Sequence, residues 1–346
     1  MALGKRKDRT TGVTGMTLRP LSPRDLDAVV GIDAQISGYS RRAYFDRRLR
    51  AGLRAPALHT QFAAEEGGKL VGYVLARRLE GEFGRADPAL RLEVIGVLPQ
   101  AQTQGIGTAL LEALEAAAQP HGILELRTQA AWNNHGMLGF LDRAGFRLGR
   151  NQMIDCGVHA GRLGNFDADK VLAPEPRNLS AEIDHSAPAA NDFEALSRDR
   201  ADVRTLARAD LEQIARLDRH ITGRDRGDYI ARSVEEALAD SAIRVSLCAH
   251  IDGGVVGYLM ASVDFGDFGR TEPVAVIDTI GVDPGFTGAG VGTALLSQLF
   301  VNLEALHVER VETVVARENF GLLGFFYRAG FEPSQRLAFV KRLGKP

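Results

Sequence analysis

The chain has 346 residues, 45% of them hydrophobic and 25% charged, and a formal net charge of −2. This composition is ordinary for a globular protein of about two domains, and the near-zero charge gives no reason to expect nucleic acid or a membrane as a partner. The two cysteines, Cys156 and Cys248, form no CxxC pair, and the histidines lack metal-ligand spacing. We therefore expect a cytoplasmic protein with neither a disulfide framework nor a metal site.

The N-terminal segment "MALGKRKDRTTGVTG" is basic and has no apolar run behind it. It does not resemble a secretory signal, and we interpret it as a disordered tail. No stretch of the chain approaches the ~18 consecutive apolar residues that a membrane-spanning helix needs.

An internal repeat organises the rest of the chain. Asp33 matches Asp218 at an offset of 185 positions, and the same offset relates "QTQGIGTALLEAL" to "TGAGVGTALLSQL". A constant offset without gaps indicates duplication of a whole domain. The stretch between the copies, rich in Pro, Asp, Ser and Ala, is typical of a linker. We therefore predict a tail, a first domain, a linker and a second domain at 1–15, 16–164, 165–200 and 201–346.

Each copy shows the same succession of elements. Each copy begins with a strand at 16–19 (202–205 in the second copy), a helix capped by Ser22 (Asp210) and a helix at 40–53 (228–239). Two strands joined by a glycine turn, a β-branched strand and an amphipathic helix from 106 (291) follow. A strand at 124–128 (310–315), a short helix and a last strand complete the copy. This order predicts an α+β fold (mixed α/β), in which each domain has one central, mostly antiparallel sheet with helices on both faces.

A Gly-x-Gly loop precedes the amphipathic helix in both copies. Such glycines let the backbone approach a ligand, and the N–H groups of a helix N-terminus attract phosphate. Two familiar phosphate loops are excluded: Thr108 stands where a Walker loop has lysine, and Leu110 stands where a dinucleotide fingerprint has its third glycine. An ordinary tight turn is the alternative.

The loops "VLPQAQTQGIGTALL" and "VDPGFTGAGVGTALL" resemble the acyl-CoA loop of the GNAT-type N-acetyltransferase superfamily, whose pattern is Gln/Arg-x-x-Gly-x-Gly/Ala. The first copy matches in full, whereas Thr287 departs from the pattern in the second. A further family signature, Asn followed eleven residues later by Gly-Phe, occurs in "NHGMLGFLDRAGF" and "NFGLLGFFYRAGF". The resemblance covers both copies and implies two tandem GNAT-like domains with acetyl-CoA, or another acyl-CoA, as cosubstrate.

By this resemblance, backbone amides of the loop bind the CoA pyrophosphate. The preceding strand binds the pantetheine arm and offers one N–H to the thioester oxygen. The cofactor-binding residues implied are Ile95, Val97, Gln102, Gln104, Gly105, Ile106, Gly107, Thr108 and Asn134 in the first copy, and Ile280, Val282, Thr287, Gly288, Ala289, Gly290, Val291, Gly292, Thr293 and Asn319 in the second.

Two strand carboxylates are candidate general bases for the amine. Glu93 and Asp278 occupy matching positions two residues before an isoleucine. Because alternate strand residues share a face, we expect each carboxylate to lie among apolar neighbours that raise its pKa. The alternative is a structural carboxylate paired with Arg91 or another cation.

A general acid for the CoA thiolate is less evident. The family usually places tyrosine seven residues after the signature asparagine, but Leu141 and Phe326 stand there. Tyr327, one residue later, is the candidate acid, with a core or surface role as the alternative. The arginine-rich segment "SRRAYFDRRLRAGLR" falls where the family forms its acceptor pocket, so it either binds an anionic acceptor or is a solvated basic face. The paired "FGR" segments suggest a turn near the acceptor site.

The sequence therefore predicts an N-acetyltransferase that transfers acetyl from acetyl-CoA to a primary amine by direct attack. The acceptor is a small molecule or a protein amine, and the protein is a monomer or homodimer with neither nucleic acid nor membrane as partner. Either copy could be the working one. The alternative from another class is a non-catalytic acyl-CoA-binding sensor or scaffold.

Overall fold

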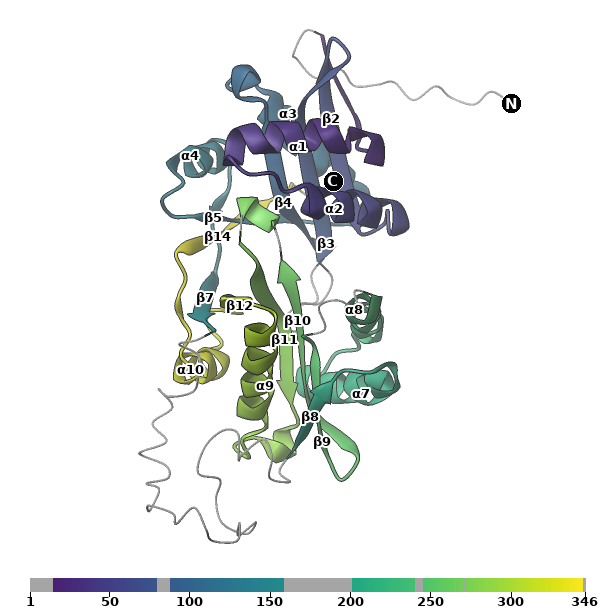
Figure 1. The fold of residues 1–346 in the computed structure, drawn as a ribbon, viewed down its shortest axis with the longest axis vertical. Coiled ribbons are helices and arrows are strands. Elements are labelled where there is room, and N and C mark those ends of the chain that lie inside the picture. Colours follow the sequence, from purple (N-terminus) through teal and green to yellow (C-terminus); the bar gives the residue numbers. More distant parts are fainter. Residues whose placement is uncertain are drawn as a thin grey trace, which may run out of the picture.

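A computed structural model of the chain describes residues 15–79, 88–158, 201–239, 245–264, 266–270 and 272–344. The predicted linker, nearly all of the predicted tail and the whole of the first "FGR" segment lie outside these residues. Figure 1 shows two α+β units stacked along the longest axis, with the first repeat above the second.

The first unit is a sheet with helices on both faces. Helices α1 and α2 pack on one face through Val29 and Phe45, and α3 and α4 pack on the other through Leu110 and Leu141. The first repeat contributes, in chain order, β1 (Met16–Pro20), α1 (Leu26–Ser37), α2 (Arg42–Arg54), β2 (His59–Glu66), β3 (Lys69–Leu79), β4 (Ala89–Val97), α3 (Ile106–Ala118), β5 (Glu125–Ala131), α4 (His135–Arg143), β6 (Arg147–Leu148) and β7 (Asn151–Gly157).

The second unit repeats this arrangement, with α7 and α8 on one face and α9 and α10 on the other. The second repeat contributes β8 (Asp202–Thr205), α7 (Leu211–Thr222), α8 (Gly227–Ala239), β9 (Leu247–Ile251), β10 (Gly254–Asp264), β11 (Val274–Val282), α9 (Val291–Ala305), β12 (Arg310–Ala316), α10 (Phe320–Arg328), β13 (Glu332–Pro333) and β14 (Arg336–Arg342). The helices that the structure describes include none that is both long and apolar enough to cross a membrane.

Within the described residues, both sheets have seven strands and one neighbouring pair in each is parallel, β4 with β5 and β11 with β12. The strand orders are β1-β2-β3-β4-β5-β14-β6 and β13-β7-β12-β11-β10-β9-β8. The α+β class and the mostly antiparallel sheets predicted from the sequence are thus confirmed.

The two units exchange their last strands. β14 runs antiparallel to β5, from Arg336 opposite Ala131 to Arg342, and β7 runs antiparallel to β12 in the equivalent register, from Asn151 opposite Ala316. Figure 1 shows yellow β14 in the upper unit and teal β7 in the lower unit. The expectation that each copy is closed by its own last strand is wrong. β7 and β14 are the same segment of the repeat, so either has the pattern needed to complete either sheet.

Candidate active site

The parallel strands at the centre of each sheet stop pairing half-way along. β4 and β5 pair only up to Arg91, and β11 and β12 only up to Ile277, although all four strands continue. At that point Thr128 Oγ1 donates to the Leu92 carbonyl and Thr313 Oγ1 donates to the Ile277 carbonyl, each at 2.9 Å. Each threonine satisfies the carbonyl where the strands part, and the strand beyond it can offer backbone groups to a ligand.

We call these openings the first wedge, between 93–97 and 128–131, and the second wedge, between 278–282 and 313–316. The two threonines stand outside the motifs from which the site was predicted. Two features of the sequence nevertheless mark them: they lie 185 positions apart in the repeat, and each breaks an otherwise apolar buried face.

Glu93 and Asp278 are each the extra residue of a β-bulge, because β3 and β10 pair with the residues on either side of them. The extra residue shifts the alternation by one. Leu92 and Ile95 consequently both pack against the core under α3, whereas Val94 packs under α1 and α2. The expectation that Glu93 shares a face with Ile95 is therefore wrong, and the matching pair in the second copy follows the same pattern.

The glycine loops present open backbone at a helix start. Gly105 and Gly290 have φ of 84° and 85°, which favours glycine, and a Cβ at either would meet open space. Helices α3 and α9 begin at the next residue, so their first N–H groups lack intrahelical acceptors. Gly107 and Gly292 serve packing instead, since a Cβ there would lie 3.0 Å or 3.1 Å from a phenylalanine ring of α4 or α10. The loops thus combine close helix packing with a backbone suited to an anion.

The other residues implied by the family resemblance surround these loops. Gln102 Nε2 donates to the Val97 carbonyl at 3.1 Å and Gln104 Nε2 to the Gln100 carbonyl at 3.3 Å, so both side chains brace the first loop. The exposed members of the set are Gln102, Gln104, Gly105, Thr108, Thr287, Gly288, Ala289 and Gly290. The half-buried members are Gly107, Gly292 and Thr293, together with Ile95, Val97, Ile280 and Val282, which pack against the core. The buried members are Ile106 and Val291.

The Asn...Gly-Phe signature has a structural part in both copies. Asn134 and Asn319 are the N-cap residues of α4 and α10, and each Oδ1 accepts the backbone N–H three residues later at 3.1 Å. Leu141 and Phe326, where the family usually has tyrosine, are buried in the two cores. Tyr327 is 41% exposed on α10.

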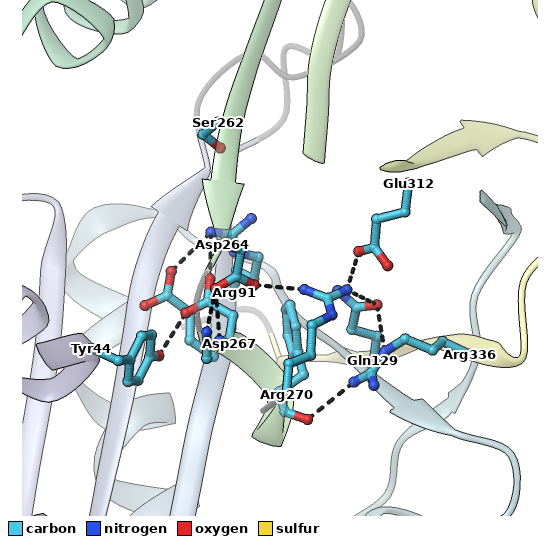
Figure 2. A network of polar contacts seen from close by, with 12 residues as sticks. Tyr44, Arg91, Gln129, Ser262, Asp264, Asp267, Arg270, Glu312 and Arg336 are labelled. Atoms are coloured by element: carbon cyan, nitrogen blue, oxygen red, sulfur yellow. Dashed lines mark hydrogen bonds and ion pairs between the residues drawn. The ribbon is translucent and has the colours of Figure 1, made fainter. Parts of the chain in front are cut away.

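Glu93 is buried in a group of charges to which both repeats contribute. It is 2% exposed and pairs with Arg48 and with Arg91, the latter at 2.9 Å. Asp267, in the turn between β10 and β11, lies 3.2 Å from Arg48 and 3.4 Å from Arg91, and Tyr44 donates its hydroxyl to Asp267 at 2.6 Å (Figure 2). We call these five residues the buried ion cluster. Glu93 thus has the arginine pairing that was the alternative to a catalytic role.

The two carboxylates of the cluster respond differently to their surroundings. Burial raises the pKa of Glu93, and the charge of Arg48 does not cancel this effect. Burial acts in the same direction on Asp267, but there the guanidinium groups of Arg48 and Arg91 outweigh it and hold the pKa below its ordinary value. Asp267 therefore stays ionised between two cations and ties the second repeat to the first.

The turn that carries Asp267 is also held through its backbone. Arg41 donates to the carbonyl of Gly266, and a Cβ at Gly266 would lie only 2.7 Å from the Tyr44 ring. Figure 1 shows this turn of the second unit reaching into the first unit. The turn lies against β4 and β5, the two strands that border the first wedge, beside the ion pairs of Glu93.

Arg41 belongs to a second buried group that occurs in both copies. It pairs with Asp33, which also accepts the Tyr73 hydroxyl at 2.9 Å, and the Tyr73 ring fills the space that a Cβ on Gly96 would occupy. The second copy repeats the group with Asp218, Arg226, Tyr258 and Gly281. The arginine-rich segment is thus partly structural: Arg41 and Arg48 form buried ion pairs and belong to neither a solvated face nor an open acceptor pocket.

A cavity of about 560 Å³ lies where the two sheets meet. Asp278 lines it, together with Ala316 of β12 and Asn319 and Leu322 of α10, so the cavity reaches the start of the second wedge. Ser262 Oγ donates to Asp278 at 3.4 Å. The cavity has the size of a small-molecule site and holds a carboxylate beside a strand with unpaired backbone, which is an arrangement suited to proton abstraction next to a bound thioester.

The model of the acetyltransferase (GNAT) family matches residues 28–146 and 210–331, which together make up more than half of the chain. The chain belongs to the GNAT family. Its fold is similar to that of a tandem GNAT protein from the clavulanic acid biosynthesis pathway, with 19% identity, a TM-score of 0.61 and coverage of 95% of this chain and 99% of that one. A GNAT protein from Sphaerobacter thermophilus matches at 16% identity and a TM-score of 0.56, with coverage of 95% and 96%. At these identities the structures support the fold alone.

As GNAT domains, the two copies differ most around the strand carboxylate. The counterparts of Arg48 and Arg91, 185 positions later, are Ser233 and Val276. The second copy therefore supplies no guanidinium group of its own at these two positions, although Arg91 of the first copy also acts electrostatically on Asp278. Family membership supports acyl transfer as the class of reaction and acyl-CoA as the class of cosubstrate, and the two copies of this GNAT protein are not equivalent for it.

One cluster in the described residues has metal-ligand chemistry. Asp210, Cys248 and His250 lie close together in the second copy, but Arg204 contacts Asp210 at 2.8 Å and the His250 ring at 3.0 Å. Burial raises the pKa of Cys248 to about 12, which disfavours the thiolate that a metal ion would bind. The first copy has an arginine–carboxylate cluster at the same place, so we interpret this group as an ion pair at a helix start.

Proposed function

We propose that this GNAT protein transfers an acyl group, acetyl in the expected case, from a CoA thioester to a primary amine, and that the second copy carries the reaction. One observation above all supports this: Asp278, on the bulge of β11, lines a cavity of about 560 Å³ that reaches the start of the second wedge. The loop at Gly290 lies at the N-terminus of α9, the position at which the family resemblance expects the pyrophosphate.

In the proposed reaction the amine nitrogen attacks the thioester carbonyl directly, forming the C–N bond while the C–S bond breaks. Asp278 accepts the proton that the amine loses and later releases it to solvent or to the sulfur. A backbone N–H of the strand segment 280–282 stabilises the oxyanion. Thiolate is a tolerable leaving group near neutral pH, so the exposed Tyr327 is not required as an acid.

The first copy has a different role in this proposal. Its loop retains the glycines and the open backbone, so it is expected to bind acyl-CoA. Its strand carboxylate, however, is held between two arginines, and the turn at Asp267 covers the side on which an amine would approach. The first copy is therefore a binding or structural domain.

Matched substitutions in the two loops test the proposal. Gly105→Asp and Gly290→Asp each place a negative side chain where pyrophosphate is expected, in a backbone region that aspartate tolerates better than most residues. Acetyl-CoA binding is measured by calorimetry, and turnover by release of the CoA thiol with a panel of primary amines. We expect each substitution to remove one binding site, and only Gly290→Asp to abolish turnover.

The base is tested with Asp278→Asn, which should lower kcat by about 10²- to 10⁴-fold and leave acetyl-CoA binding unchanged. Turnover that is lost in Gly105→Asp and kept in Gly290→Asp would assign the reaction to the first copy instead. Binding without thiol release for any amine would favour the non-catalytic sensor. Failure of folded wild-type protein to bind acetyl-CoA would overturn the proposal.

A further inference from the structure

The strand that borders the second wedge is held from one side. β11 pairs with β10 from Val274 to Val282, but with β12 only as far as Ile277. Beyond Ile277, within the described residues, the edge of β11 that faces the wedge has no strand partner. Its position therefore depends on β10 and on the side chains packed beneath it. That position matters in the proposed reaction, because backbone donors stabilise an oxyanion only when they are aimed at it.

The register with β10 decides which backbone groups face the second wedge. The N–H of Asp283 donates to the carbonyl opposite it on β10 at 2.8 Å. Directly opposite residues of an antiparallel pair alternate between those that exchange hydrogen bonds and those that do not, so two positions earlier Gly281 and Tyr258 form a hydrogen-bonded pair. Ile280 and Val282 consequently turn their N–H and carbonyl groups away from β10 and toward the wedge.

The Tyr258 side chain links this strand segment to helix α7. Gly281 leaves space for the ring, since a Cβ there would lie 2.6 Å from a Tyr258 ring carbon. At the other end of the ring, the hydroxyl donates to Asp218 of α7 at 2.5 Å. Asp218 in turn pairs with Arg226, and all three side chains of this group are buried. The ring is thus a spacer whose two ends are both fixed.

Two features keep the Tyr258 hydroxyl in this place. Burial, followed by the charge of Asp218, raises its pKa, so the phenol stays protonated and remains a donor. Thr279 acts on the same hydroxyl from β11 itself, whereas the first copy has Val94 at that position. In the second copy the tyrosine therefore meets the wedge strand at Thr279 as well as at Gly281.

We propose that Tyr258, held by Asp218, is a positioning residue whose ring fixes Gly281 and so aims the neighbouring backbone groups of β11 at the thioester. This inference rests on the proposed function. The alternative is a purely structural tyrosine, whose ring fills space and whose hydroxyl adds stability without affecting the reaction. The two roles differ in what the loss of the hydroxyl does to kcat in folded protein.

The first copy provides a matched comparison. There Tyr73 donates to Asp33 at 2.9 Å, and its ring occupies the corresponding space at Gly96. Tyr258→Phe and Tyr73→Phe therefore remove the same hydrogen bond from the two copies and leave both rings in place. The hydroxyl of the exposed Tyr39 serves as the neutral control, in the variant Tyr39→Phe.

The full chain is used for all measurements. They are the thermal midpoint, acetyl-CoA binding by calorimetry, and kcat from thiol release at saturating acetyl-CoA with a panel of primary amines. We expect Tyr258→Phe to lower kcat by about 10- to 10²-fold, since a displacement of less than an ångström misaligns the reacting groups, and to raise the KM for acetyl-CoA by a smaller factor. Tyr73→Phe should lower the thermal midpoint by a similar amount and change kcat far less.

Three results would overturn the inference. If kcat in Tyr258→Phe equals that in Tyr39→Phe, the hydroxyl plays no part in the reaction. Equal losses of kcat in Tyr258→Phe and Tyr73→Phe would show a general effect of stability. A loss confined to Tyr73→Phe would contradict the assignment of the reaction to the second copy, and the inference with it.

If the wild type releases no thiol with any amine, the proposed function has failed, and acetyl-CoA binding alone tests whether the tyrosine fixes the strand. Tyr258→Phe should then weaken binding about threefold to tenfold at the site that Gly290→Asp removes. Tyr73→Phe should do the same at the site that Gly105→Asp removes. Affinities that remain unchanged at both sites would overturn the inference.

Discussion

Replacing Asp267 by alanine should destabilise the whole protein, because this carboxylate joins the second repeat to the buried charges of the first. It lies 3.2 Å from Arg48 and 3.4 Å from Arg91, and it accepts the Tyr44 hydroxyl at 2.6 Å. Without it, Glu93 is the one carboxylate among the described residues that still forms an ion pair with either of these two largely buried guanidinium groups. Breaking a buried ion pair from one side costs about 3–5 kcal/mol, a large part of the ~5–15 kcal/mol that separates folded from unfolded protein.

The measurement is urea denaturation of wild type, Asp267→Ala and Glu272→Ala, with circular dichroism as the probe. Glu272 is an exposed acid near the same turn, and its loss should change the free energy of unfolding by no more than about 0.5 kcal/mol. A loss of less than about 1 kcal/mol for Asp267→Ala at pH 7 would refute the reasoning, since so small an effect is that of a solvated pair.

The pH dependence gives the same experiment a second readout. The pKa of Asp267 is lower in the folded protein than its ordinary value of 3.8. A depressed folded pKa means that the carboxylate contributes its stabilisation fully above the unfolded pKa and loses it as the pH falls through the folded one. The difference in unfolding free energy between wild type and Asp267→Ala should therefore be constant from about pH 5 to 7 and shrink below about pH 4. A difference that persists undiminished at pH 2 would contradict the ionic origin of the effect.

Two further substitutions and one division of the chain probe the frame around the wedges. Gly96→Ala would place a Cβ 2.6 Å from the Tyr73 ring and should cost about 1–3 kcal/mol, seen as a lower thermal midpoint; an unchanged midpoint would show that the ring can move away. Thr313→Val keeps the side-chain shape but leaves a buried carbonyl of β11 unpaired, so urea denaturation should show a loss of about 1–3 kcal/mol, and a neutral result would mean that the carbonyl finds another donor. Halves 1–164 and 201–346 expressed together should copurify, because each ends in a strand of the other's sheet; separate monomeric halves would contradict the strand exchange.

The sequence by itself determined the parts of this protein that depend on local pattern. The offset of 185 positions established the duplication, and the glycines at 105 and 290 established a loop whose backbone only glycine adopts readily. Strand and helix periodicity predicted both sheets and their helix layers. The loop and the periodicity follow from residues a few positions apart, so one repeat contains the information for them, whereas the duplication is visible only when both repeats are compared.

The tertiary structure alone decided how the two copies combine. Alternation along β7 and β14 specifies a buried face but no partner strand, so their exchange could not be predicted. The bulge at Glu93 was equally hidden, because it depends on the register with β3. The different surroundings of Glu93 and Asp278 depend on Arg48, Arg91 and a turn from the other repeat, and a charge from a distant segment acts on a pKa only once folding brings it within a few ångströms.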